Sequence, residues 1–356
     1  MNVPAPRPPA FEQPTVTDDP AGRRPRTLLA MDPALRPRLL GPDQLLRLHQ
    51  VADTDSAEIH RDFTTPAARA ALGEAEVILS FWGCPTVDAA VLDAAPHLRA
   101  IVHAAGSVKG IITEACWARG VQVSSAAWAN ALPVAEYTVA AVLASNKHLL
   151  QAHRDFRALR DPEGWHHRLS SVGNYRRVVG IVGASRIGRR VIELLRPHDL
   201  DLLVHDPYLS QAEALALGVH AVSLDELCAR SDVVSVHAPE LPETRHMIDR
   251  ARLALMPDGA TLINTARGSL LDTQALIDEL RSGRLYAVLD VTDPDPLPAH
   301  SPLFDLPNLV LTPHIAGSVG GELHRMADSA LAEIDRYRRG LPLAHPVLRE
   351  ELPRTA

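Results

Sequence analysis

The chain has 356 residues and a formal net charge of −7, with 46% hydrophobic and 22% charged residues. This composition is that of an ordinary soluble globular protein, and the length favours two domains. An acidic chain without a dense basic stretch is unsuited to nucleic acid, and no apolar run approaches the roughly 18 residues of a membrane span. Cys84, Cys116 and Cys228 form no CxxC pair, which argues against disulfides or zinc and favours a reducing cytoplasm.

The N-terminal segment, residues 1–26, is rich in proline and polar residues. Such a segment cannot bury enough apolar surface to offset its ordering, so we expect a disordered arm. Arg23-Arg24 could belong to an export signal, but the apolar stretch 27–31 that follows is short and runs into Asp32. A cytoplasmic protein with an irregular N-terminus is therefore the preferred interpretation.

The histidines are scattered along the chain. His166-His167 and His153 could contact a metal, but adjacent side chains point in different directions. Because no ligand spacing supports a metal site, a polar surface segment is the preferred interpretation and we expect no metal.

The first part of the folded chain alternates between short apolar runs and helix-like segments. This alternation predicts a parallel α/β layer. The expected strands are 27–31, 77–80, 100–103 and 121–124, and the expected helices are 87–95 and 111–119.

An apolar, alanine-rich stretch over residues 133–150 predicts a helix. Pro133 suits its first turn, and Glu136 lies where the helix dipole favours an anion. The stretch is too apolar to stand alone in water, so we expect it to be buried between domains or against a second subunit. A polar stretch, 154–177, then leads into a second βαβ series over 178–313.

A glycine-bearing turn opens this second series. Residues 177–182 predict a strand, and the turn 183–188 leads into a helix expected to begin near Arg189. Glycines there permit a tight turn, and the helix N-terminus offers free N–H groups to a pyrophosphate. Ser185 stands where G-x-G-x-x-G has its second glycine. Its Cβ obstructs the backbone approach but its hydroxyl can donate to a phosphate, so we expect binding to persist.

Asp206 ends the next predicted strand, 23 residues after Gly183, near the spacing of about 20 residues at which an acid binds an adenosine ribose. It would repel a 2′-phosphate, and no arginine follows it closely, which favours NAD over NADP. The alternative is a glycine turn of an unrelated α/β protein.

Three ionisable side chains, Arg267, Asp295 and His314, each follow a short apolar run. Such runs read as buried parallel strands, and an open parallel sheet binds its ligand beyond the carboxyl ends of its strands. We therefore expect the three side chains to converge. A cation, a carboxylate and an imidazole suit the binding of a carboxylate and the transfer of a proton beside it. Taken singly, Arg267 could form a surface ion pair and His314 could be a core histidine.

Six segments occur in a characteristic order and spacing. They are VGIVGASRIGRRV, VHDPYLS, HAPELPETRHMI, INTARGSLLD, LDVTDPDPLP and LTPHIAGS. With them the chain resembles the D-isomer-specific 2-hydroxyacid dehydrogenases over residues 27–346. The resemblance implies an α/β fold in which a Rossmann-type, doubly wound parallel-sheet cofactor domain is inserted into a smaller, flavodoxin-like α/β substrate domain. The implied parts are a substrate domain of 27–124 plus 318–346, an NAD-binding domain of 125–317 and a tail of 347–356.

The resemblance also implies an NAD(H)-dependent oxidoreductase, a homodimer that interconverts a small anionic 2-ketoacid and a D-2-hydroxy acid and works as a reductase. Arg267 would bind the substrate carboxylate and carbonyl, His314 would be the acid/base, and Asp295, where the family usually has glutamate, would pair with it. An arginine fork fits a carboxylate, and a carboxylate beside an imidazole favours its charged form and fixes its tautomer.

The same resemblance assigns the binding residues. Asp290 matches the position that holds the nicotinamide carboxamide. The expected cofactor contacts are Gly183, Ser185, Arg186, Ile187, Gly188, Asp206, His237, Ala238, Pro239, Thr244, Thr265, Ala266, Asp290, His314 and Gly317. The expected substrate contacts are Trp82, Gly83, Gly106, Ser107, Val108, Lys109 and Arg267.

Several alternatives stay open. Lys109 could read a second anionic group on the substrate or be a solvated surface charge. Trp128 and Asn130 are expected on loops, and Trp128 is as suited to packing as to binding. Formate oxidation is disfavoured because Pro313 stands where those enzymes carry glutamine, whereas phosphite-type oxidation and an NAD-sensing, corepressor-like binding protein remain possible. The sequence names neither the substrate nor the direction.

Overall fold

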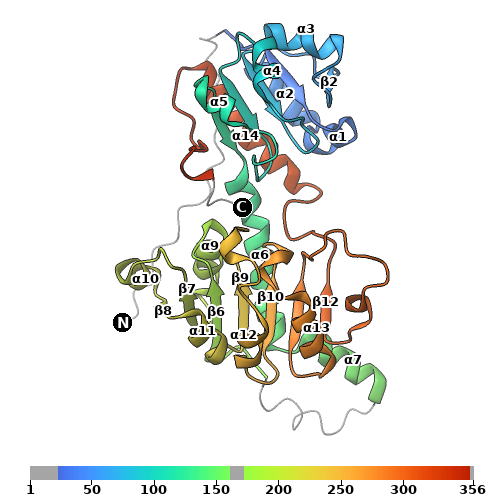
Figure 1. Ribbon diagram of the computed structural model, residues 1–356, viewed down its shortest axis with the longest axis vertical. Helices are drawn as coiled ribbons and strands as arrows, with labels where there is room; N and C mark the ends of the chain where they lie inside the picture. The colour runs from blue at the N-terminus through green and yellow to red at the C-terminus, as the bar shows by residue number, and fades with distance from the viewer. Residues whose placement is uncertain (1–22, 161–171, 353–356) are drawn as a thin grey trace. The chain divides into compact units, whose positions relative to one another are not determined.

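The computed structural model describes residues 23–160 and 172–352. They divide into two compact units (Figure 1). Unit 1 runs to Asn130 and resumes over Val319–Leu352, and unit 2 is Ala131–Ser318. Both are parallel α/β units, so the predicted fold, a Rossmann-type unit inserted into a flavodoxin-like one, is confirmed.

The described residues of unit 1 form a five-stranded sheet of order β2-β1-β3-β4-β5 in which every pairing is parallel. This is the flavodoxin-like strand order. The strands are β1 (Thr27–Ala30), β2 (Ile59–His60), β3 (Val77–Ser80), β4 (Ala100–His103) and β5 (Gln122–Ser125).

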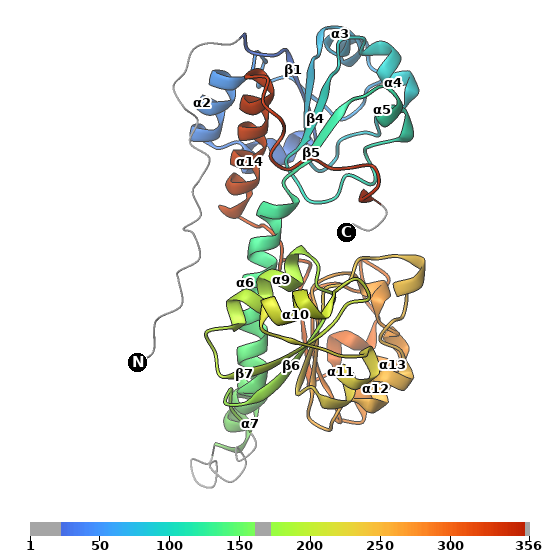
Figure 2. The same ribbon diagram turned by 90° about the vertical axis from the view of Figure 1, so that its left-hand side faces the viewer.

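Helices cover both faces of the sheet in unit 1 (Figure 2). One face packs on α1 (Arg36–Leu39), α2 (Pro42–Val51) and α14 (Glu322–Arg338), and the other on α3 (Pro66–Glu74), α4 (Ala89–Ala94) and α5 (Glu114–Ala118). Successive strand residues supply both cores: Leu29 belongs to the first and Leu28 to the second. A strand buried on both faces must be apolar throughout, as the sequence pattern predicted.

The described residues of unit 2 form a seven-stranded parallel sheet of order β12-β11-β10-β9-β6-β7-β8. The chain starts in the middle at β6, moves outward to β8, and returns to continue from β9. The point where the direction reverses, between β6 and β9, is where such sheets bind ligands. The strands are β6 (Arg177–Val182), β7 (Leu200–His205), β8 (His220–Ala221), β9 (Val233–Val236), β10 (Thr261–Asn264), β11 (Tyr286–Leu289) and β12 (Leu309–Leu311).

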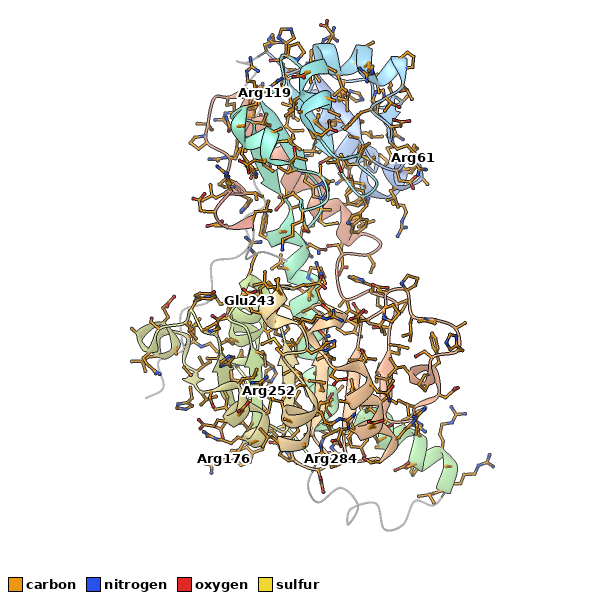
Figure 3. All side chains as sticks on the ribbon, viewed as in Figure 1. Arg61, Arg119, Arg176, Glu243, Arg252 and Arg284 are labelled. Atoms are coloured by element: carbon orange, nitrogen blue, oxygen red, sulfur yellow. The ribbon has the colours of Figure 1, made fainter. Side chains whose placement is uncertain are left out.

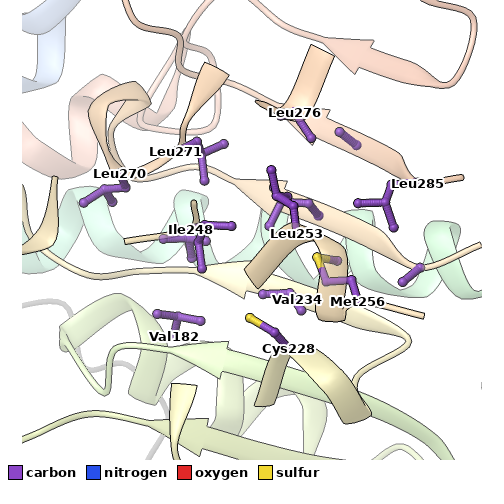
Figure 4. Close-up of a cluster of buried hydrophobic side chains, with 14 of the residues drawn as sticks. Val182, Cys228, Val234, Ile248, Leu253, Met256, Leu270, Leu271, Leu276 and Leu285 are labelled. Carbon is purple, nitrogen blue, oxygen red and sulfur yellow. The ribbon is translucent and has the colours of Figure 1, made fainter. Parts of the chain in front are cut away.

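Two layers of helices cover this sheet. One face packs on α6 (Ala127–Asn146), α9 (Arg186–Leu195) and α10 (Gln211–Leu217). The other packs on α11 (Leu224–Arg230), α12 (Arg250–Leu255) and α13 (Thr273–Arg281), whose core, including Cys228, Val234 and Leu253, appears in Figure 4. Helix α7 (Leu149–Leu159) follows α6. Short 3₁₀ helices are η1 (Pro33–Leu35), η2 (Pro242–Thr244), η3 (Gly268–Leu270) and η4 (Pro302–Asp305).

Ion pairs tie the outer helices of unit 2 together, and Figure 3 labels two of the arginines involved. Arg252 donates through Nε to Asp225 at 2.8 Å and so links α12 to α11. Arg284, just after α13, donates through Nε to Glu279 of that helix at 2.7 Å and through a terminal nitrogen to Leu253 O of α12, which links α13 to α12. These contacts are partly exposed, so each adds little to stability beside the apolar core.

Helix α6 differs from its prediction. It begins at Ala127 and ends at Asn146, so Pro133 lies inside the helix and the expected first turn at Pro133 is wrong. The reason is tertiary, because Ala129 is fully buried in the core of unit 1 and the helix has formed before the proline is reached. The same early start puts Trp128 and Asn130 on a helix rather than on loops, and the unit boundary follows residue 130 rather than 124.

The expected ends of the folded chain are also wrong in part. Arg23, placed in a disordered arm, pairs with Glu76 at 2.5 Å, and the Arg26 N–H donates to the same carboxylate at 3.1 Å. Val347, placed in a tail, donates its N–H to Val123 O at 2.8 Å. Both ends are held by long-range contacts that local composition does not reveal.

Some expectations lie outside the described residues. Residues 1–22 and 353–356 are among these, as are His166-His167. Within the described ranges, no group of three or more His, Cys, Asp or Glu side chains could hold a metal ion. No helix in the part of the chain that is described is long and apolar enough to cross a membrane.

Candidate active site

Gly183 brings three strand-end loops of unit 2 together. Its φ is +99°, and a Cβ there would lie 2.9 Å from Ala238 N, so only glycine fits without strain. The Gly183 N–H donates to His205 O at 2.8 Å. The loops after β6, β7 and β9 therefore meet at the reversal point of the sheet.

Helix α9 begins directly after this turn. It starts at Arg186, three residues before the predicted Arg189, because Ser185 is its N-cap and accepts from Gly188 N at 3.3 Å. The N–H groups of Arg186 and Ile187 lie in the first turn, where no intrahelical acceptor exists. These donors suit a pyrophosphate. Ser185 accepts one bond, which leaves its hydroxyl hydrogen for a phosphate oxygen.

Asp206 stands beside the same turn at the end of β7. One carboxylate oxygen accepts from Ala184 N at 2.7 Å and the other from Tyr208 N at 2.8 Å. Each oxygen keeps capacity to accept a further bond. The residue therefore fixes the turn and still presents an acceptor surface that suits two ribose hydroxyls.

Arg267 follows β10 and precedes η3. The next residue, Gly268, packs so closely that a Cβ there would lie 2.0 Å from the Thr292 carbonyl carbon, which brings the loops after β10 and β11 into backbone contact. The half-buried guanidinium donates to Ala266 O at 2.7 Å. Among the described residues it forms no ion pair, so its charge is available to an anion.

His314 and Asp295 form the expected pair. Nδ1 of His314 lies 3.3 Å from an Asp295 carboxylate oxygen, and the two side chains are 56% and 55% exposed. Asp293, the acidic residue two positions before Asp295, instead lies 3.5 Å from Arg245. The structure therefore brings Asp295, and not Asp293, to the imidazole.

Asp290 is 2% exposed, and its carboxylate accepts hydrogen bonds from the turn that carries His314. One carboxylate oxygen accepts from the Thr312 hydroxyl at 2.6 Å and from Ile315 N at 2.8 Å, and the other accepts from Ala316 N at 2.8 Å. One acceptor position remains on the second oxygen. That position is compatible with a carboxamide, whose binding by Asp290 stays a prediction.

His237 lies deeper than expected for a side chain that contacts a cofactor. It is 3% exposed, and its Nε2 lies 2.9 Å from the Ser235 hydroxyl. Burial lowers the pKa of His237 to about 3, so its imidazole is neutral. Only its backbone, which packs against Gly183, reaches the phosphate turn.

The other expected cofactor residues of unit 2 form two loops. Thr244 donates to Pro239 O at 2.7 Å and accepts from Leu241 N at 2.9 Å, which closes the loop after β9. Thr265, after β10, is buried and its hydroxyl lies 3.1 Å from that of Thr138. These hydroxyls hold loop shape, and their contact with a cofactor stays a prediction.

The expected substrate residues of unit 1 also lie on strand-end loops. Trp82 follows β3, is 43% exposed and packs on Phe81 with ring centroids 4.4 Å apart. In the loop after β4, Val108 is buried while Ser107 and Lys109 are exposed. Trp128 packs, because its Nε1 donates to Ser329 at 3.0 Å and its ring stacks on His345.

Sequence reasoning missed Tyr137. Its hydroxyl lies 2.8 Å from the hydroxyl of Thr312, which in turn donates to Asp290. No sequence motif marks this contact. It depends on which side of helix α6 faces the loop after β12.

Comparison with known proteins decides the family. Residues 139–316 match the family model described as "D-isomer specific 2-hydroxyacid dehydrogenase, NAD binding domain". The chain belongs to the D-isomer-specific 2-hydroxyacid dehydrogenases. It is 37% identical over 266 residues to D-3-phosphoglycerate dehydrogenase of Mycobacterium leprae (strain TN), covering 74% of this chain and 49% of that protein.

Two further members of the family are similar. Glyoxylate reductase of Thermofilum pendens (strain Hrk 5) is 34% identical over 71% of this chain and 76% of its own. A solved phosphoglycerate oxidoreductase from Rhizobium etli superposes with a TM-score of 0.78 at 25% identity, covering 92% of this chain and 99% of that one. The chain spans about half the length of the mycobacterial relative. Unit 2 thus contains the NAD-binding domain of this family, as its glycine turn predicted.

Proposed function

We propose that this family member is an NAD(H)-dependent dehydrogenase that interconverts a small 2-ketoacid and a D-2-hydroxy acid, working as a reductase. The observation that carries the proposal is the His314–Asp295 pair, with 3.3 Å between Nδ1 and the carboxylate, in a domain that also carries the free charge of Arg267. A proton donor and an anion-binding guanidinium are the two groups that carbonyl reduction requires from the protein.

Each catalytic side chain has one task in this proposal. NAD(H), when bound, supplies or accepts the hydride. Arg267 binds the substrate carboxylate through its fork of donors and stabilises the negative charge that develops on the carbonyl oxygen. His314 donates the proton to that oxygen, and Asp295 holds the imidazole in the tautomer that can do so.

The cofactor would be NAD rather than NADP. The first-turn N–H groups of α9 would receive the pyrophosphate, and Asp206 would accept from both ribose hydroxyls. The close approach at Gly183 leaves this cradle unobstructed by a side chain. Asp290 would accept from the carboxamide, and the loops 237–239 and 265–266 would line the nicotinamide end.

The substrate would contact unit 1 through Trp82-Gly83 and through the loop 106–109. Backbone N–H groups of that loop suit a carboxylate. The relatives are named for D-3-phosphoglycerate and glyoxylate, which are small anionic acids. Whether Lys109 reads a second anionic group decides between these two classes of substrate.

The test is a spectrophotometric scan at 340 nm with NADH and a panel of 2-ketoacids, with and without a phosphate group, beside phosphite and NAD⁺. The proposal expects consumption of NADH with at least one 2-ketoacid. NADH formation with phosphite alone would favour phosphite oxidation. NADH binding without turnover of any compound would favour a cofactor-sensing binding protein.

We further propose a cytoplasmic homodimer. Helix α7 supports the dimer. None of its side chains is buried, and two of its leucines, Leu149 and Leu150, are 57% and 45% exposed. Contiguous exposed apolar side chains mark interaction sites. Light scattering should give twice the mass of the chain, and Leu150→Asp should shift it towards the monomer; a monomeric wild type would contradict the proposal.

The free cysteines support a reducing compartment, which fractionation of cells would test.

A further inference from the structure

We propose that Tyr137 is a positioning residue, which holds the turn carrying His314 in place through Thr312 and Asp290. The role of His314 rests on the proposed function. The contacts themselves do not, since all of them lie within unit 2.

The direction of each hydrogen bond in this chain of contacts follows from the number of available protons. The Thr312 hydroxyl has one hydrogen and donates it to Asp290 at 2.6 Å. The 2.8 Å contact between Tyr137 and Thr312 must therefore be donated by the phenol. Burial, and the nearby charge of Asp290, raise the pKa of Tyr137 above its ordinary value, so the phenol keeps the proton that it donates.

The other end of the chain of contacts is the backbone around His314. The Asp290 carboxylate accepts from Ile315 N and Ala316 N, both at 2.8 Å, and the Asp290 carbonyl accepts from His314 N at 3.0 Å. His314 has a φ of +56°, a left-handed conformation that is strained for a residue other than glycine. The bonds to Asp290 offset that strain.

Tyr137 acts on this turn by fixing Thr312. Asp290 is almost fully buried, and a buried carboxylate depends on every donor that faces it. Hydrogen bonds in series polarise one another, so a phenol that donates to Thr312 strengthens the bond from Thr312 to Asp290. Without the phenol the Thr312 oxygen lacks its donor, its hydroxyl is freer to turn away, and the carboxylate loses its hold on the two amides.

The test is amide hydrogen exchange on the full-length protein. In Tyr137→Phe, the amides of residues 314–316 should exchange about three- to tenfold faster, because one hydrogen bond of the series is lost. Amides of β6 should be unchanged. The matched control is Tyr286→Phe, since Tyr286 begins β11 at the opposite end of the sheet and its ring contacts His148. It should leave residues 314–316 as in the wild type.

Two further comparisons separate positioning from general destabilisation. Thr312→Val should accelerate the same amides, Thr312→Ser should restore slow exchange, and adding Tyr137→Phe to Thr312→Val should have no further effect. If Tyr137→Phe fails to fold, the pair Thr312→Val and Thr312→Ser carries the test, because Thr312→Val removes the hydroxyl that accepts from Tyr137 while the side chain keeps its size. In the folded variant kcat with a 2-ketoacid should fall about fivefold while the Kd for NADH, from fluorescence titration, stays within twofold.

Unchanged exchange at residues 314–316 in Tyr137→Phe, or equal acceleration in Tyr286→Phe, would overturn the inference. A raised Kd for NADH with unchanged kcat would also overturn it, because the network would then serve cofactor binding and not His314. Faster exchange in a protein that turns over no 2-ketoacid would instead refute the proposed function and leave the positioning of the turn established.

Discussion

Both units place a tightly packed glycine turn at the reversal point of their parallel sheet, but the groups around the two turns differ. Gly83 in unit 1 has a φ of +85°, and a Cβ there would lie 2.7 Å from Asp32 N; Gly183 in unit 2 has a φ of +99° and packs as tightly on Ala238. After Gly183 a helix begins at Arg186, whereas after Gly83 the next helix begins only at Ala89. In unit 1 the short helix η1 does begin directly after β1, but its first residue is Pro33, which has no N–H, and the Ala34 N–H donates to Asp32 at 2.9 Å. Among the described residues at the two reversal points, the free helical N–H groups are therefore those of α9 in unit 2.

The strand ends differ in charge as well. In unit 1 the residues that end β3 and β4 are Ser80 and His103, which are buried and contact each other at 2.9 Å. In unit 2 the corresponding loops carry Arg267, Asp290 and His314. A parallel sheet therefore supplies the place for a site, and the side chains just beyond its strands supply the chemistry.

The largest expected effect comes from removing the positive charge of Arg267 in unit 2. Arg267→Ala should lower kcat/KM for a 2-ketoacid by two decades or more, about 2.7 kcal/mol, because the lost contact strengthens as the oxyanion forms. Arg267→Lys should recover only part of the rate. Steady-state kinetics measures both, with the exposed Arg281→Ala as control. Loss of NADH binding along with activity would show that Arg267 is structural.

Each unit contains a buried histidine whose protonation should make the free energy of unfolding depend on pH. Burial lowers the pKa of His103 in unit 1 to about 4 and that of His237 in unit 2 to about 3. Each stays neutral when folded but binds a proton when unfolded below pH ~6.5, so its contribution is complete above that pH and is lost as pH falls towards the folded pKa. Between pH 8 and pH 5 each should cost about 2 kcal/mol.

Urea unfolding at the two pH values checks this. The loss on acidification should be smaller by that amount in His103→Asn and in His237→Asn, whatever their stability at pH 8. His220→Asn removes an exposed histidine of β8 and should retain the full wild-type loss. An equal loss in all four proteins would contradict the account.

The choice between NADH and NADPH tests the role of the acidic side chain at the reversal point of the unit 2 sheet. The native protein should prefer NADH over NADPH at least tenfold in kcat/KM, about 1.4 kcal/mol, and Asp206→Ser should erode the preference. Asp201→Ser makes the same change of charge on the same strand, at an exposed position, and should not. Equal use of both cofactors by the native protein would refute the assignment of Asp206 to the ribose.

The smallest effect concerns Asp295. Its pair with His314 is more than half exposed, so it contributes at most about 1 kcal/mol. Asp295→Asn should lower reductive kcat/KM about threefold, because a neutral amide holds the imidazole less firmly than a carboxylate does. Asp295→Glu keeps the charge and should retain more of the rate. Steady-state kinetics at saturating NADH decides, with Asp293→Asn as control; the same kcat/KM in Asp295→Asn as in the wild type would show that Asp295 does not act on His314.

Much of the fold can be predicted from the sequence, because buried parallel strands are continuous apolar runs. The predicted strands 77–80 and 100–103 match β3 and β4 residue for residue. The start of α6 was missed because a proline inside a helix reads locally as a helix start, while the burial of Ala129 that extends the helix is a tertiary contact.

The site follows the same division. The approach of Asp295 to His314 could be predicted, because both follow neighbouring strands of one parallel sheet. The bonds of Asp290 to the turn after β12, and the contact of Tyr137 with Thr312, could not. The Tyr137 contact depends on the rotation of a helix against a loop 175 residues away in the chain. The Asp290 bonds depend on the backbone conformation of the turn that holds Ile315 and Ala316. No local pattern encodes either.

The direct test of hydride transfer from the cofactor to a 2-ketoacid uses NADH that carries deuterium at both C4 positions. The wild-type protein is incubated with the best 2-ketoacid of the panel, and the product is separated on a chiral column and weighed by mass spectrometry. We expect the D-2-hydroxy acid with deuterium at C2, formed at least a hundredfold more slowly by Arg267→Ala. An L-product, a product without deuterium at C2, or the same rate in Arg267→Ala would contradict it.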